Sequence, residues 1–193
     1  LRTMARDLAD AIRDMPRPMK QLALAMLFQW YGMFCYWQYV VFSLSRSLFD
    51  DAGVDAVRDA ALANGRLGAF YNAVAFVAAL ALVPITRRLG AKPVHALCMV
   101  ASGLAMLALP RMTAEAWAYL PMIGIGLGWA SLMGNPYVML AGSIPAERTG
   151  VYMGIFNMFI VVPMLIQSLT MPLIYEPLLS RDARNVLLLA GAM

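Results

Sequence analysis

The sequence predicts an all-helical integral membrane protein, and two observations support this fold class. Five long stretches of the chain contain no Asp, Glu, Lys or Arg. A bilayer core of about 30 Å requires about 20 apolar residues of helix, because unpaired peptide groups cannot face hydrocarbon. Hydrophobic residues make up 62% of the chain and charged residues 13%, against about 45–50% and about 25% in soluble domains.

The predicted spans follow one another along residues 21–193, which we expect to form a transmembrane helix bundle. Five complete spans are expected at residues 21–45, 67–86, 93–110, 116–146 and 149–175. A sixth apolar segment begins at Asn185 and stops after nine residues, so the bundle is expected to be incomplete at its end. Because the chain starts with Leu1 and shows no signal peptide, we interpret it as the C-terminal part of a longer protein. Cys35 and Cys98 fall inside spans, so no disulfide is expected.

Residues 1–20 are expected to form a cytoplasmic linker before the first span. Five apolar side chains in this stretch follow helical spacing, with charged residues between them: Leu1, Met4, Leu8, Ile12 and Met15. This pattern is consistent with an amphipathic helix on the membrane surface. A solvated linker helix that ends at Pro16 and Pro18 fits the pattern equally well.

The charges between the spans predict the topology. Residues 1–20 carry five basic side chains and residues 87–92 carry three, whereas residues 50–59 carry four aspartates. Cytoplasmic loops are enriched in Lys and Arg. We therefore expect a multi-pass protein of the cell inner membrane, with the N-terminal end of this chain and residues 145–148 inside and residues 50–59 outside. The net charge of +4 follows this topology, so no nucleic-acid partner is expected.

The sequence does not predict an enzyme, a metal centre or a cofactor. It contains one histidine, His95, and no cluster of His and Cys that could ligate a metal. No carboxylate lies within a complete span, and Ser143 is not in a nucleophile elbow. The glycine-rich run at residues 123–128 lies inside a span, where small residues allow helices to pack closely.

The polar side chains inside the spans are mainly amides and aromatic hydroxyls, which suit a sugar. Amides donate to and accept from sugar hydroxyls, and flat rings cover the C–H faces. We predict that Gln38, Asn72 and Asn135 bind the substrate, with Tyr31 and Tyr137 as flanking surfaces. The alternative is that the amides join helices and that the aromatic residues form the interfacial belt.

Helical geometry constrains this set. Gln29 and Gln38 are nine residues apart, which at about 100° per residue places them on opposite helix faces. Tyr31 shares the face of Gln38. Pro136 lacks an N–H and clashes with the preceding turn, so the span at residues 116–146 is expected to break there, either as a gate beside a cavity or as a plain kink.

Four sequence motifs suggest a family. They are F-Q-W-Y-G-M-F at residues 28–34, P-I-T-R-R-L-G-A-K at residues 84–92, W-A-S-L-M-G-N-P-Y-V-M-L at residues 129–140 and I-P-A-E-R-T-G-V-Y-M-G-I-F-N at residues 144–157. The second resembles the loop between paired helices of the major facilitator superfamily, although it lacks the loop's acid. Together, the other three are similar to the sucrose and maltose proton symporters of the glycoside–pentoside–hexuronide and plant sucrose-carrier group.

The resemblance implies the second six-helix half of a twelve-helix transporter. The expected partners are a disaccharide, a proton, the lipid bilayer and the missing N-terminal half, which holds the family's main coupling acid. Residues expected to act in gating or structure are Pro136, Arg148, Asn157, Arg87 and Arg88. This half alone is not expected to transport. The alternative is a membrane sensor or scaffold that keeps the fold without coupled flux.

Overall fold

The computed structural model describes residues 12–50, 52–144 and 149–193, and every regular element in these ranges is helical. The elements are α2 (Arg17–Leu48), α3 (Val54–Leu89), α4 (Ala91–Ala108), the short 3-10 helix η1 (Leu109–Arg111), α5 (Glu115–Ala141), α6 (Thr149–Ile174) and α7 (Ala183–Ala192). The predicted all-helical fold class is confirmed. Leu1, Met4 and Leu8 lie outside the described residues, and so does most of the predicted surface helix.

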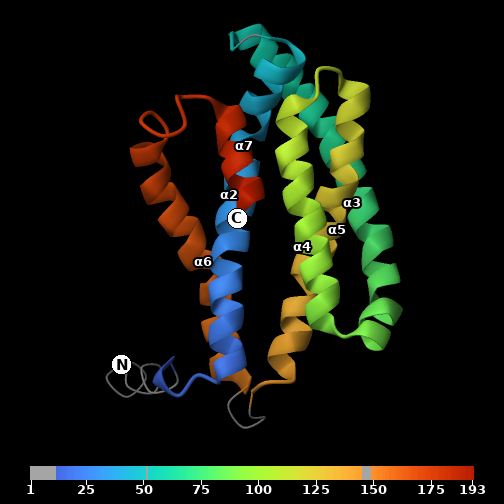
Figure 1. The fold of residues 1–193 in the computed structure, drawn as a ribbon, viewed down its shortest axis with the longest axis vertical. Coiled ribbons are helices and arrows are strands. Elements are labelled where there is room, and N and C mark those ends of the chain that lie inside the picture. Colours follow the sequence, from blue (N-terminus) through green and yellow to red (C-terminus); the bar gives the residue numbers. More distant parts are fainter. Residues whose placement is uncertain (1–11, 51, 145–148) are drawn as a thin grey trace.

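The helices run up and down through one bundle (Figure 1). Helix α2 packs against α3, α6 and α7, while α5 packs mainly against α3 and α4. Because the chain reverses at each connection, the acidic start of α3 and the basic turn at Gly90 lie at opposite ends (Figure 1). The alternation predicted from the charges is therefore observed, and the assignment of one end to the cytoplasm stays a prediction.

Within the part of the chain that the structure describes, four helices are long and apolar enough to cross a membrane: α3, α4 with η1, α5 and α6. Helix α2 has 32 residues and a charge-free run at residues 21–45. It is not among the four, because its glutamines, tyrosines and tryptophans lower its hydropathy. Its identification as a span rests on its length and its packing against three other helices. Helix α7 is apolar and has ten residues.

Two predicted boundaries need correction. Residues 54–66 were expected in a loop, but they form the first turns of α3, which has 36 residues. This extension is alanine-rich and carries ion pairs of Arg58 with Asp55 at 3.7 Å and with Asp59 at 3.5 Å. Helix α2 begins at Arg17, before the predicted start of the first span at residue 21, because a proline is tolerated in the first helical turn, where its missing N–H has no intrahelical partner.

Glycines on α5 permit close helix packing, as the sequence predicts. A Cβ added at Gly124 would lie 2.6 Å from the carbonyl oxygen of Ala101 on α4, and one at Gly128 would clash with the Cβ of Ser102. On the opposite face, a Cβ at Gly126 would lie 2.7 Å from the carbonyl oxygen of Tyr71 on α3. Helix α5 is therefore held between α3 and α4 at distances that only glycine allows.

Helix α5 does not break at Pro136. It continues from Glu115 to Ala141 with Pro121 and Pro136 inside it. A proline removes one main-chain donor, but the turns on either side keep their own hydrogen bonds and the packing against α3 and α4. A broken helix at Pro136 is therefore wrong, and the alternative of a plain kink stays a prediction. The thiols of Cys35 and Cys98 are free and buried, as predicted.

Candidate functional site

A hydrogen-bonded chain of polar side chains crosses the bundle through four helices, and we call it the polar chain. His95 Nδ1 lies 2.9 Å from Ser131 Oγ, and His95 Nε2 lies 3.0 Å from Gln29 Nε2 and 3.3 Å from Gln29 Oε1. Asn135 Nδ2 donates to Ser131 Oγ at 2.8 Å, and Thr86 Oγ1 donates to Asn135 Oδ1 at 3.0 Å. The polar chain therefore joins α2, α4, α5 and α3 in that order.

Helical spacing and burial explain this arrangement. Ser131 and Asn135 are one turn apart on α5, so they lie on the same face. His95, Ser131 and Asn135 are buried, with exposed fractions of 5%, 0% and 5%. Buried polar groups require hydrogen-bond partners. Each member supplies a partner to the next, which fixes the relative rotation of the four helices.

A second polar cluster lies between α2 and α6, and we call it the amide seam: Tyr31, Gln38, Gln167 and Thr170. The Tyr31 hydroxyl lies 2.8 Å from Thr170 Oγ1, and Gln167 Nε2 donates to Gln38 Oε1 at 3.1 Å. Gln167 is fully buried, and its Oε1 has no hydrogen-bond partner among the residues that the structure describes. Gln38 is exposed. The amide seam therefore combines an accessible amide with a buried amide oxygen that can still accept a hydrogen bond.

Three tryptophans form a mutual edge-to-face cluster between α2 and α5. The ring centroids of Trp37 and Trp129 are 5.3 Å apart, and Trp30 lies 6.3 Å from Trp37 and 6.2 Å from Trp129. Such T-shaped pairs are the favoured geometry of aromatic rings. Trp30 is flanked in sequence by Gln29 and Tyr31, which belong to the two polar clusters. Trp30 therefore separates a residue of the polar chain from a residue of the amide seam along α2.

The polar chain connects two cavities. Gln29 and His95 line a cavity of about 330 Å³ between α2, α4 and α5, and Lys92 is its charged lining residue. Thr86 and Asn135 line a cavity of about 670 Å³ between α3 and α5. The two ends of the polar chain therefore reach different cavities.

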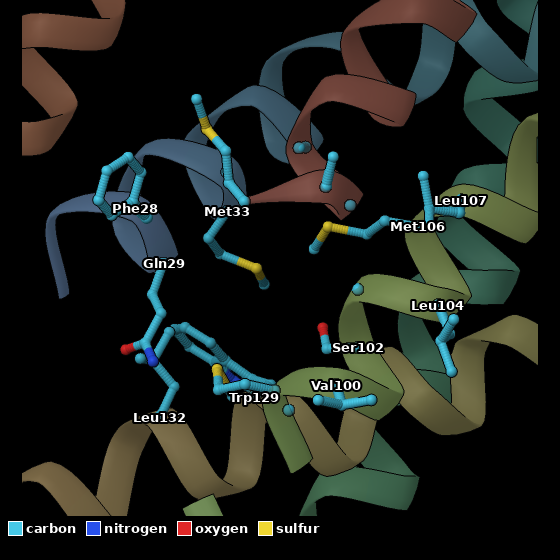
Figure 2. Close-up of a pocket in the computed structure, with 18 of the residues that line it drawn as sticks. Phe28, Gln29, Met33, Val100, Ser102, Leu104, Met106, Leu107, Trp129 and Leu132 are labelled. Carbon is cyan, nitrogen blue, oxygen red and sulfur yellow. The ribbon is translucent and has the colours of Figure 1, made fainter. Parts of the chain in front are cut away.

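A third cavity, of about 420 Å³, lies among α2, α4, α5 and α7. Figure 2 shows Gln29 and Trp129 on one side of it and Leu104 and Leu107 on the other. Its lining is mostly apolar, with Gln29 and Ser102 as its polar side chains. The lining of this cavity therefore offers few groups that could form hydrogen bonds with a polar ligand.

The structure brings only part of the predicted substrate set together. Tyr31 and Gln38 share the amide seam, whereas Asn135 belongs to the polar chain. Asn72 is exposed, and its amide donates to the carbonyl oxygen of Gly68 on its own helix at 2.8 Å. The ring of Tyr137 packs against Phe156, with centroids 4.7 Å apart.

The residues predicted to act in gating or structure lie both at helix ends and within helices. Arg87 and Arg88 are exposed in the last turn of α3, where positive charge stabilises the helix dipole. Asn157 is exposed on α6, and Pro136 is buried within α5. Arg148 lies outside the described residues.

Sequence reasoning placed Gln29 and Gln38 on opposite faces of α2, and this is confirmed, because Gln29 contacts α4 while Gln38 bonds to α6. It missed His95, Ser131 and Thr86 as members of a site. The spacing of Ser131 and Asn135 was a usable signal, whereas the partners of His95 depend on which helices are neighbours. Among the described residues, no three His, Cys, Asp or Glu side chains gather as a group that could hold a metal.

Comparison with known proteins identifies the family. A search of the curated proteins and a search of the solved structures each found no match. The family model described as Major Facilitator Superfamily matches residues 6–168, which is well over half of the chain and includes α2 to α5 and most of α6. With this match and its bundle of long apolar helices, the chain belongs to the Major Facilitator Superfamily and is part of a multi-pass membrane transporter.

Proposed function

We propose that this transporter is a secondary active carrier that takes up a disaccharide, such as sucrose, maltose or a related glucoside, together with a proton. The motifs at residues 28–34, 129–140 and 144–157 resemble disaccharide–proton symporters and support this substrate class. The cell inner membrane, with the N-terminal end of the chain in the cytoplasm, is the matching location.

The observation that supports a sugar most directly is the amide seam. Gln167 Oε1 is buried and accepts no hydrogen bond from the described residues, and its neighbour Gln38 is exposed. A sugar hydroxyl can donate to an amide oxygen and accept from an amide N–H at the same time. Trp37 follows directly before Gln38 and presents a half-buried ring. In this proposal Gln38 and Gln167 bind hydroxyls, and Tyr31 and Trp37 flank the sugar.

We propose that the carrier also contains a second six-helix half, which we call the partner half. This chain joined to the partner half is the intact carrier. Only 11% of the residues in the most apolar stretch of α3 and 22% of those in α6 are buried, against 50% in α5. The large apolar faces of α3 and α6 suit lipid and the partner half. Transport would then proceed by rocking of the two halves about a site between them.

The test is sugar binding by variants of the amide seam. We expect Gln38→Leu and Gln167→Leu to weaken sucrose binding by the intact carrier about 5- to 150-fold, because a hydrogen bond lost in a dry site costs about 1–3 kcal/mol. Isothermal titration of purified protein measures the Kd. Ser168→Ala is the matched control, since Ser168 is exposed beside Gln167 and bonds to its own helix.

Two outcomes would count against this assignment. If both leucine variants fold normally and bind sucrose like the parent, the amides only join α2 to α6. If the parent binds neither sucrose nor maltose, the disaccharide class is wrong.

A further inference from the structure

His95 is the buried titratable group in the polar chain, and both of its partners can reverse their hydrogen-bonding role. The Ser131 hydroxyl can donate to or accept from Nδ1, and the Gln29 amide can present either its nitrogen or its oxygen to Nε2. The two Gln29 atoms lie 3.0 and 3.3 Å from Nε2, so a small rotation exchanges them. The pocket can therefore satisfy a neutral imidazole in either tautomer and also an imidazolium.

Both ring nitrogens of His95 have a hydrogen-bond partner in the neutral and in the protonated state. In the neutral ring, Ser131 Oγ–H donates to Nδ1 and Nε2–H donates to Gln29 Oε1. When a proton binds Nδ1, both ring nitrogens become donors, and Ser131 Oγ accepts from His95 as well as from Asn135. The Ser131 hydrogen then turns away, as a serine inside a helix does when it bonds to the preceding turn.

The cavity beside His95 gives the proton a path, and the residues around it determine the charges that His95 faces. His95 lines the cavity of about 330 Å³ together with Lys92, and the lining residues given by α2 and α5 are uncharged. The thiol of Cys98 lies beside Ser131, and Arg87 lines the second cavity beside Asn135. No carboxylate lines either cavity in the described part of the chain, so the oxygens of Ser131 and Gln29 must stabilise the imidazolium.

We infer that His95 is a proton-binding site that exchanges its proton through the cavity between α2 and α4, and that its charge state is passed through Ser131 to Asn135. Two donors converge on Ser131 Oγ once His95 is charged, which weakens the bond from Asn135 and frees its amide toward the second cavity. The proton site stands on the geometry of the polar chain. Its link to solute uptake rests on the proposed function.

The direct test is nuclear magnetic resonance of ¹⁵N-histidine-labelled intact carrier between pH 4 and 9. His95→Asn identifies the signals of His95. We expect the two ring nitrogens to change reversibly from neutral to imidazolium positions with one midpoint. Charge-assisted hydrogen bonds are the stronger ones, so Ser131→Ala and Gln29→Leu should each lower this midpoint by about 0.5 to 1 pH unit.

Ser47→Ala is the matched control, because Ser47 bonds to the carbonyl oxygen of Ser43 at 3.0 Å and is not among the residues that line the cavity of His95. Its midpoint should equal that of the parent. The inference is overturned if the ring stays neutral over the whole range. It is also overturned if the midpoint is the same in the parent, Ser131→Ala and Gln29→Leu.

A transport assay separates this inference from the proposed function. His95→Gln keeps a hydrogen-bonding side chain but cannot bind the proton, so we expect sucrose exchange to persist while accumulation driven by a proton gradient is lost. Unchanged accumulation would overturn the link to uptake. If the parent moves no sucrose but His95 titrates as expected, the proposed substrate fails and the proton site stands.

Discussion

The close packing of α5 on α4 gives a quantitative prediction at Gly124. In Gly124→Ala the added Cβ would lie 2.6 Å from the carbonyl oxygen of Ala101, 2.8 Å from the Cβ of Ala105 and 3.2 Å from the carbonyl carbon of Ala101. Two of these atoms are backbone, so a rotamer change cannot relieve the contact and the two helices must separate. Overpacking of this kind destabilises by about 1–3 kcal/mol.

Gly134→Ala is the matched control, because Gly134 lies on the same helix and a Cβ there meets nothing within 4 Å. Both variants gain the same helix propensity, about 0.5–1 kcal/mol, so their difference isolates the packing term. At about 2–4 °C per kcal/mol for a chain of this size, Gly124→Ala should melt about 2 to 12 °C below Gly134→Ala.

The assay is thermal unfolding of the purified protein, followed by intrinsic fluorescence in one detergent for both variants. Equal melting temperatures, or a higher one for Gly124→Ala, would refute the close approach of α4 and α5. A fall in both variants would instead show that these glycines act through flexibility of α5 and not through packing.

Two further predictions concern Asn135 and Asp182. Asn135→Leu should lower the melting temperature, because it removes the acceptor of Thr86 and the donor to Ser131, and a buried polar group that loses its partner costs about 1–3 kcal/mol; an unchanged melting temperature would show that these bonds add no stability. Partial burial opposes ionisation of Asp182, but the hydrogen bonds from Arg184 and the charge of Arg46, 3.6 Å away, outweigh it and lower the pKa of Asp182. Its stabilisation is therefore present above the ordinary carboxyl pKa and is lost as pH falls through the lowered value. The melting temperature of the parent should converge on that of Asp182→Asn in acid, and a constant difference would contradict this.

The sequence predicted the elements well where one physical effect dominates. Charge-free runs give the spans because hydrocarbon excludes charge, and the glycines at residues 123–128 indicated packing because only a small residue allows close approach. The start of α3 was missed because its first turns carry four aspartates or arginines, which resemble a loop although alanine and local ion pairs favour helix. A helix can extend beyond the bilayer, and composition alone does not show this.

The site was predicted only in part because its contacts depend on helix neighbours. The face of Gln38 follows from 3.6 residues per turn, but its partner Gln167 is 129 residues away on α6. In the sequence, His95 was considered only as a metal ligand, and it was set aside because it lacks further ligands nearby. Its position between Gln29 and Ser131 follows from the packing of α2 and α5 around α4. Periodicity gives the face of each helix, and packing decides which faces meet.

The most direct test of the account is sucrose and maltose uptake by proteoliposomes that contain the intact carrier, with and without an inward proton gradient. We expect saturable uptake of a disaccharide that the gradient accelerates and a proton uncoupler abolishes. Uptake of both sugars no faster than in protein-free liposomes would contradict the disaccharide class, and uptake that the uncoupler leaves unchanged would contradict proton coupling.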